Sequence, residues 1–191
     1  MRTPRIFVGS SNEGLPIAEA VQLRLEPPYE VELWTQGVYG LTQGNLENLL
    51  RAVPTFDFAI LVLTADDLKV SRGDTTPAAR DNVVFELGVF LGALGPDRTF
   101  MVYDRTRPPS LPSDLSGVAA ATFQPHANGN LDAALGSPST KIKQVIAKVT
   151  AAAGAQQNAL TSGSPNSLPP PGKRFDEMFD WLVSHKQTKR N

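Results

Sequence analysis

The sequence predicts an α/β protein built on a doubly wound parallel sheet. Short apolar runs and helical segments alternate along the chain, which is the pattern of consecutive strand–helix units. The run Phe58-Ala59-Ile60-Leu61-Val62-Leu63 is apolar without interruption. Such a run is typical of a central parallel strand that is covered by helices on both faces.

Strands are expected where a compact apolar run ends in loop residues. The first run, Arg5-Ile6-Phe7-Val8-Gly9, stops at Ser10-Ser11-Asn12. The second leads into a glycine-containing loop over residues 35–43, and the last is the weakest. In chain order the expected strands are 5–9, 31–34, 58–63, 99–103 and 118–123.

Helices are expected where apolar residues recur every three or four positions. The segment 15–25 carries Ile17, Val21 and Leu25 on one face and ends before Pro27-Pro28. The segment between the third and fourth strands contains Gly88 and Gly92, which small-residue helix packing explains, and ends at a C-cap, Gly95. This segment is the expected helix 83–94, and the two remaining expected helices are 46–53 and 141–152.

The composition excludes several function classes. The chain has 191 residues with 18 basic and 19 acidic side chains, so nothing favours binding to nucleic acid or to an anionic membrane. Cysteine is absent, which excludes disulfides and thiolate chemistry. The two histidines, His126 and His185, are isolated in sequence, and no metal site is expected. No leader peptide or membrane span is recognisable, so we expect a soluble, cytoplasmic protein.

Three regions are expected along the chain. Residues 1–153 hold the strand–helix units and form one domain. Residues 154–172 are rich in Pro, Ser, Gly and Gln and predict a linker. Residues 173–191 contain Phe175, Met178, Phe179 and Leu182 at helical spacing, which predicts a short helix that could begin a truncated second module.

A lone acid, Glu86, lies within the most apolar of the expected helices. Residues 83–94 are apolar almost all round, so this helix is expected to be buried. A carboxylate is rarely buried without a partner. Either Glu86 forms a structural ion pair with Arg80, or a reaction needs its carboxylate. Asn82 lies one turn earlier on the same face.

Other candidate residues follow the strands at the carboxyl edge of the sheet, where such folds bind ligands. Gly9-Ser10-Ser11 could accept a phosphate, or could be an ordinary turn. Asp66 and Asp67 could hold a ribose hydroxyl or Mg²⁺, or could cap a helix. Trp34 begins a loop that could close over a flat aromatic ligand, or its ring could belong to the core.

The usual nucleotide-binding motifs are absent from the sequence. There is no G-x-x-x-x-G-K-[ST], and the glycines at 88, 92 and 95 belong to a helix rather than to a G-x-G-x-x-G turn. The chain therefore does not bind a nucleotide in the manner of ATPases or Rossmann dehydrogenases.

Four blocks nevertheless resemble one family, the bacterial TIR-like domains described as predicted nucleotide-binding proteins, which occur in anti-phage effectors fused to STING-type or other cyclic-nucleotide sensors. The most specific block is RDNVVFELGVFLGALG, residues 80–95; the others are IFVGSSNEG at 6–14, DFAILVLTADD at 57–67 and LPSDLSG at 111–117. The resemblance covers residues 5–152. It implies a flavodoxin-like TIR fold with a five-stranded parallel sheet and helices on both faces.

The resemblance also implies an activity, namely cleavage of NAD⁺ to nicotinamide and linear or cyclic ADP-ribose, with NAD⁺ as substrate and no cofactor. The catalytic glutamate of the family maps onto Glu86. Cleavage of the nicotinamide–ribose bond passes through an oxocarbenium-like state. Nicotinamide leaves as a neutral molecule, so one carboxylate suffices without a general acid. We expect substrate contacts from Gly9, Ser10, Ser11, Trp34, Asp66, Arg80 and Asn82.

Two other functions remain open at this point. One is a nucleoside N-glycosidase or deoxyribosyltransferase, which also uses a lone glutamate. The other is a non-catalytic TIR scaffold. The resemblance further implies activation by assembly into a homo-oligomer or filament, with loop 35–43 moving at the contact, and association with a cyclic-nucleotide sensor domain or protein.

Overall fold

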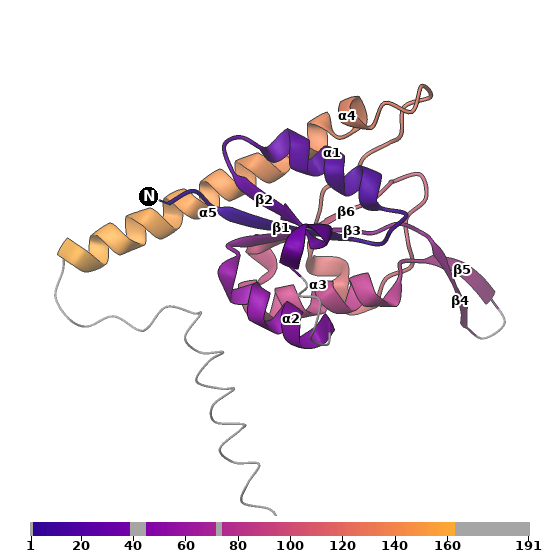
Figure 1. Cartoon of the computed structure of the whole chain (residues 1–191), viewed down its shortest axis with the longest axis horizontal. Helices are drawn as coiled ribbons and strands as arrows, with labels where there is room; N and C mark the ends of the chain where they lie inside the picture. The colour runs from indigo at the N-terminus through magenta and orange to yellow at the C-terminus, as the bar shows by residue number, and fades with distance from the viewer. Residues whose placement is uncertain (1, 39–44, 72–73, 163–191) are drawn as a thin grey trace, which may run out of the picture. The chain divides into compact units, whose positions relative to one another are not determined.

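The computed structural model describes residues 2–38, 45–71 and 74–162 (Figure 1). The chain divides into two compact units, residues 1–149 and 150–191. The first unit contains the whole sheet. Among the described residues, no helix is long and apolar enough to cross a bilayer.

The first unit is built on a parallel sheet with the strand order β2-β1-β3-β6-β7. When its strands are counted along the chain within this sheet, the order is 2-1-3-4-5, the doubly wound order of flavodoxin-like folds. The predicted fold class is therefore confirmed. The strands are β1 (Arg5–Ser10), β2 (Glu30–Leu33), β3 (Phe58–Val62), β6 (Thr99–Val102) and β7 (Ala119–Ala120).

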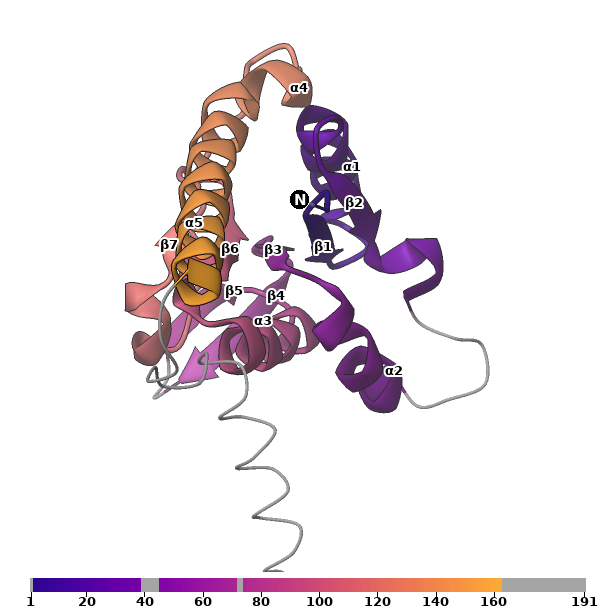
Figure 2. The ribbon, with the colours of Figure 1, turned by 90° about the vertical axis from the view of Figure 1, so that its left-hand side faces the viewer.

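Helices cover both faces of the sheet (Figure 2). Alternate residues of each strand point to opposite faces, so Ile6 and Val8 contact one apolar cluster while Phe7 contacts the other. The first face packs against α1 (Leu15–Leu25) and the early part of α5 (Gly136–Ser162). The second packs against α2 (Asn45–Ala52) and α3 (Asp81–Leu94).

The expectation that the helix carrying Glu86 is buried all round is wrong. In α3, Val83, Leu87 and Phe90 face the sheet and are buried, whereas Phe85 is 54% exposed. Glycines 88 and 92 are exposed and have no neighbour where a side chain would start, so they do not serve close helix packing. The reason is that α3 belongs to the outer layer on its face of the sheet. Its apolar composition does not decide which side is covered.

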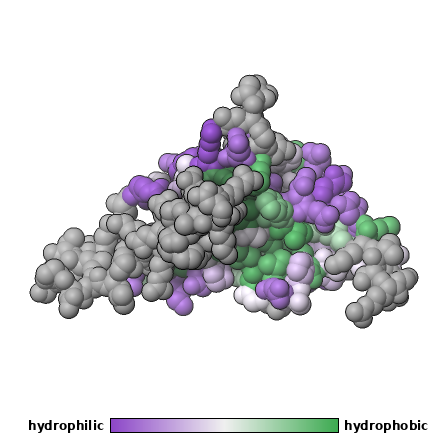
Figure 3. All heavy atoms as spheres, turned by 90° about the horizontal axis from the view of Figure 1, so that it is seen from below, coloured by the Kyte–Doolittle hydropathy of each residue, from purple (hydrophilic) through white to green (hydrophobic). Residues whose placement is uncertain are grey.

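The outer side of this layer is apolar at its surface. Two leucines of α2, Leu46 and Leu50, are about half exposed, as Phe85 is on α3. The side of the molecule on which α2 and α3 lie shows an apolar area in the described part of the surface (Figure 3). Surface patches of this kind often mark binding or association sites.

Several local predictions differ from the structure. The antiparallel hairpin of β4 (Asp67–Ser71) and β5 (Asp74–Ala78) is not among the expected strands. The exposed Leu68 and the proline Pro77 hide the alternation that would signal these strands. The predicted strand 118–123 is only two residues long, with a further bridge between Asp104 and Phe123. Gly95 does end α3, with φ of 84°.

The last described helix is longer than predicted. It begins at Gly136 and ends at Ser162, so residues 154–162 of the expected linker are helical. This stretch is rich in Ala and Gln, which are good helix formers. Residues 163–191, with the expected short helix, lie outside the described residues.

Candidate active site

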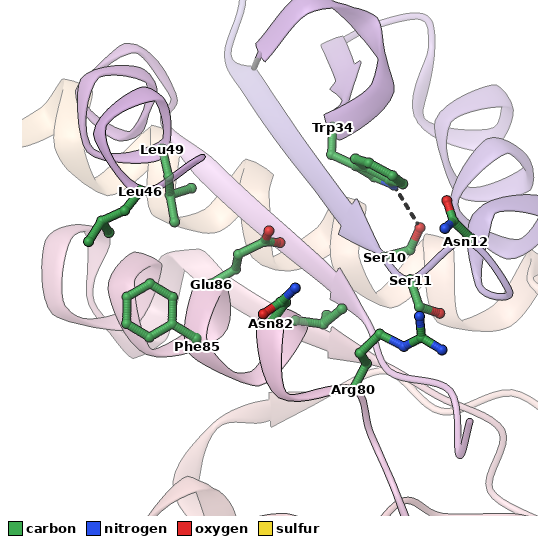
Figure 4. Close-up of a pocket in the computed structure, with 11 residues that line it drawn as sticks. Ser10, Ser11, Asn12, Trp34, Leu46, Leu49, Arg80, Asn82, Phe85 and Glu86 are labelled. Atoms are coloured by element: carbon green, nitrogen blue, oxygen red, sulfur yellow. Dashed lines mark hydrogen bonds between the residues drawn. The ribbon is translucent and has the colours of Figure 1, made fainter. Parts of the chain in front are cut away.

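A pocket of about 440 Å³ lies at the carboxyl end of β1, a size common for small-molecule sites. It is formed by the loop after β1, the residue after β2, helix α2 and the first turns of α3 (Figure 4). Six residues that the sequence singled out line it together: Ser10, Ser11, Trp34, Arg80, Asn82 and Glu86.

Glu86 reaches from α3 toward the end of β1 (Figure 4). Its side chain is half-buried. Asn82 lies one turn earlier on α3 and lines the same space, as the helical spacing predicts. Gly9 does not itself line the pocket, but it lies behind Glu86, because a methyl group at position 9 would be 3.0 Å from Glu86 Oε2.

Trp34 forms one wall of the pocket. Its indole Nε1 donates a hydrogen bond to Ser10 Oγ at 3.1 Å (Figure 4). The ring is half-buried and also packs against the apolar cluster under α2 and α3. The ring therefore packs on the core on one side and lines the pocket on the other.

Asp66 lies behind the loop after β1 rather than in this pocket. Ser11 Oγ donates to Asp66 Oδ2 at 2.6 Å and accepts the Gly14 N–H at 3.0 Å. Thr64 Oγ1 also donates to the same Asp66 oxygen. Asp66 lines a separate depression together with Thr64 and Asp104. Its geometry is that of a group that orients the Ser11 hydroxyl. Among the residues that the structure describes, no group of three or more His, Asp or Glu could hold a metal ion.

Arg80 lies at the mouth of the pocket with its own carboxylate partners. Its Nη2 is 3.2 Å from Glu13 Oε1, and its Nε is 3.7 Å from Asp67 Oδ2. Both partners are about half exposed, so these ion pairs contribute little to stability. Among the described lining residues, Arg80 is the one that carries a positive charge.

The pocket has a polar side and an apolar side. Hydroxyl and amide groups follow β1 and begin α3, next to Arg80, whereas α2 and α3 supply apolar side chains. Such a pocket suits a ligand with an aromatic ring, a sugar and an anionic group. The sequence reasoning missed five lining residues, Asn12, Leu46, Leu49, Val83 and Phe85. The four apolar ones carry no signal in sequence that separates them from core residues.

The sequence matches a family model described as the TIR domain of CAP12/Pycsar effector proteins, over residues 5–125. It is 45% identical over 120 residues to CD-NTase-associated protein 12 of Flavobacterium daejeonense, a match that covers 63% of this chain and 38% of that protein. It is 40% identical over 124 residues to the Pycsar effector protein PaPycTIR of Pseudomonas aeruginosa, covering 64% of this chain and 40% of that protein.

A third relative, the Pycsar effector protein BcPycTIR of Burkholderia cepacia, is 34% identical over 143 residues, covering 74% of this chain and 47% of that protein. The matches thus span less than half the length of each of these three relatives. A solved structure of a diflavin flavoprotein A3 from Nostoc sp. aligns with a TM-score of 0.45 and 14% identity, covering 76% of this chain and 96% of that chain.

Proposed function

The chain belongs to the family of CAP12/Pycsar effector TIR domains, and on this premise we propose that it is the NAD⁺-cleaving domain of an anti-phage effector. It releases nicotinamide from NAD⁺ and leaves ADP-ribose, in linear or cyclic form. The observation that carries the proposal is the pocket at the end of β1 that presents the Glu86 carboxylate beside hydroxyl, amide and guanidinium groups. Since NAD⁺ is a cytoplasmic metabolite, the proposal places the chain in the cytoplasm.

Glu86 acts on the ribose carbon that bears nicotinamide. The bond between this carbon and the pyridinium nitrogen breaks, and its electron pair stays with nicotinamide, which leaves uncharged. The carboxylate stabilises the positive charge that develops on the sugar, or bonds to it transiently. For the linear product, water then adds to the same carbon and loses a proton to the solvent, which completes a glycoside hydrolysis. For the cyclic product, a ring nitrogen of the substrate's own adenine bonds to this carbon in place of water.

The remaining lining residues match the other parts of NAD⁺. Trp34, Leu46 and Phe85 offer apolar surface to a flat ring, while Ser10, Ser11 and Asn82 offer hydrogen-bonding groups to the ribose. Arg80 offers a planar donor set to the diphosphate, the geometry in which arginine binds phosphate most strongly.

Replacing Arg80 with alanine should therefore weaken NAD⁺ cleavage by about tenfold to a hundredfold, the effect of about 1.5–3 kcal/mol from a hydrogen bond to a charged group. The loss should appear mainly in KM. Cleavage of nicotinamide riboside, which lacks the diphosphate, should change little. Steady-state kinetics with both substrates test this, with Arg80→Lys as the matched variant that keeps the charge. An equal loss on both substrates would instead assign Arg80 to the ribose or to Glu86.

We further propose that the domain is active when assembled with copies of itself. The pocket is flanked by Leu46, Leu50 and Phe85, each about half exposed. A second copy that covers this apolar side would shield the pocket from water, which strengthens electrostatic interactions in the site. A cyclic-nucleotide sensor, in the same protein or a partner, would control that assembly.

One experiment tests the activity and its control together. The protein is incubated, from nanomolar to tens of micromolar, with NAD⁺ and separately with purine and pyrimidine nucleosides. We expect nicotinamide release from NAD⁺, with a specific activity that rises steeply with protein concentration. Release of bases from nucleosides alone would indicate an N-glycosidase. Release of neither would leave a TIR scaffold, and a flat specific activity on NAD⁺ would show that a single copy is sufficient.

A further inference from the structure

We infer that Gly9 positions Glu86, because the missing side chain at residue 9 is the space that the Glu86 carboxylate needs at the end of β1. Gly9 is then a positioning residue rather than a phosphate contact. The inference rests on the proposed function, in which Glu86 is the reacting group.

Gly9 is enclosed on three sides where a side chain would begin. A methyl group there would lie 2.7 Å from Leu61 Cδ1, 2.8 Å from Phe7 Cε1 and 3.0 Å from Glu86 Oε2. All three distances are at or below the closest approach of non-bonded carbon and oxygen atoms. No residue other than glycine fits this position without moving a neighbour.

The backbone conformation does not require a glycine at position 9. Among the described residues, the glycines with positive φ are Gly37, Gly95 and Gly129, so the conformation of Gly9 is open to other residues. Gly9 instead pairs with Leu61 in the parallel ladder between β1 and β3. A glycine inside a strand weakens the strand and marks a place where another group approaches closely. Here the approaching groups are the side chains of Leu61 and Phe7 and, from the pocket side, the carboxylate of Glu86.

The three neighbours differ in their freedom to move. Leu61 and Phe7 are completely buried, and a packed interior resists displacement. Glu86 is half-buried and borders the open pocket (Figure 4). An added methyl group would require small shifts of Leu61 and Phe7. It would also push the Glu86 carboxylate, the neighbour with the most room to move, away from the end of β1 and out of its position relative to the ribose.

Gly9→Ala should consequently lower kcat for NAD⁺ by about tenfold, because the carboxylate must give way by a few tenths of an ångström and a misplacement of about 1 Å can cost about a hundredfold. KM should change less than about twofold, because the residues expected to bind the diphosphate and the ring keep their places. Thermal melting is measured in parallel, and Gly9→Ala with Leu61→Val removes the closest core contact. If that double variant recovers both melting temperature and kcat, the effect is one of core packing and the inference is wrong.

A double-mutant cycle separates positioning from general damage. Glu86→Asp moves the carboxylate back by one methylene, which should leave a low but measurable activity. Adding Gly9→Ala to Glu86→Asp should cost less than about threefold, because the shorter side chain has already left the space. A loss as large as in the wild-type background would overturn the inference.

A crystal structure of the Gly9→Ala protein gives a readout that does not depend on activity. We expect the Glu86 carboxylate to be displaced while Ser10 and Asn82 stay in place. If the wild-type protein cleaves no NAD⁺, the proposed function fails, and this structure alone decides whether Gly9 sets the position of Glu86. An unmoved carboxylate would refute the inference whatever the activity.

Discussion

Glu86→Gln is expected to lower NAD⁺ cleavage by at least about a hundredfold while leaving the fold intact. Glutamine has nearly the same shape but carries no negative charge, so it can neither stabilise the sugar cation nor bond to it. Removal of a single preorganised group that stabilises a transition state typically costs about a hundredfold to a thousandfold in kcat. The side chain is half-buried, and the amide fills the same space as the carboxylate. The melting temperature should therefore change little.

The matched control is Glu19→Gln, an equally conservative change at an exposed position of α1. It should alter neither nicotinamide release nor melting. A Glu86→Gln protein that melts at a lower temperature and keeps its activity would show that Glu86 has a structural role. In that case structural contacts of the carboxylate, rather than catalysis, explain why Glu86 lies in an apolar helix.

The sheet is the part of the fold that sequence predicts best. β3 is apolar over its whole length and all of its residues are buried, so composition and burial agree without knowledge of the neighbours. The same holds for residues 6–8 of β1. Strands at the edge of a sheet carry a weaker signal in the sequence, because they are partly exposed to solvent and are not apolar over their whole length. This explains why the last strand is shorter than the predicted range 118–123 and why β4 and β5 are not predicted from the sequence.

Part of the site was predictable because it depends on local patterns in the chain. Loops that follow parallel strands meet at one edge of the sheet, which brings Ser10 and Ser11 close to Trp34, and the helical period brings Asn82 close to Glu86. The exposure of Phe85 depends on what packs outside α3, which no local pattern encodes. The contact between Gly9 and Glu86 joins residues far apart in the chain, so it follows from the packing of α3 on β1 and not from either segment alone.

That packing leads to the second large effect. Phe90→Ala should lower the free energy of unfolding by about 3–5 kcal/mol, the usual cost of removing a buried ring and leaving a cavity. Phe90 is completely buried. Its ring stacks on Phe7 with centroids 4.6 Å apart, and Phe56 lies at its edge at 6.5 Å. Unfolding in guanidinium chloride, followed by circular dichroism, measures the change.

Phe85→Ala is the control, because it removes the same side chain from the same helix at a position that is 54% exposed. Phe85→Ala should lower the free energy of unfolding by less than about 1 kcal/mol.

Phe90 lies one turn beyond Glu86, and Phe7 lies two residues before Gly9. The stacked rings therefore hold together α3 and β1, the two elements that set the position of the carboxylate. The folded fraction of Phe90→Ala should therefore also show a reduced kcat, with little change in KM. Equal losses of stability for Phe85→Ala and Phe90→Ala would mean that contacts on the outer side of α3 stabilise the helix as much as its contacts with the sheet do. The apolar surface on that side would then already be covered in solution, as an assembled domain requires.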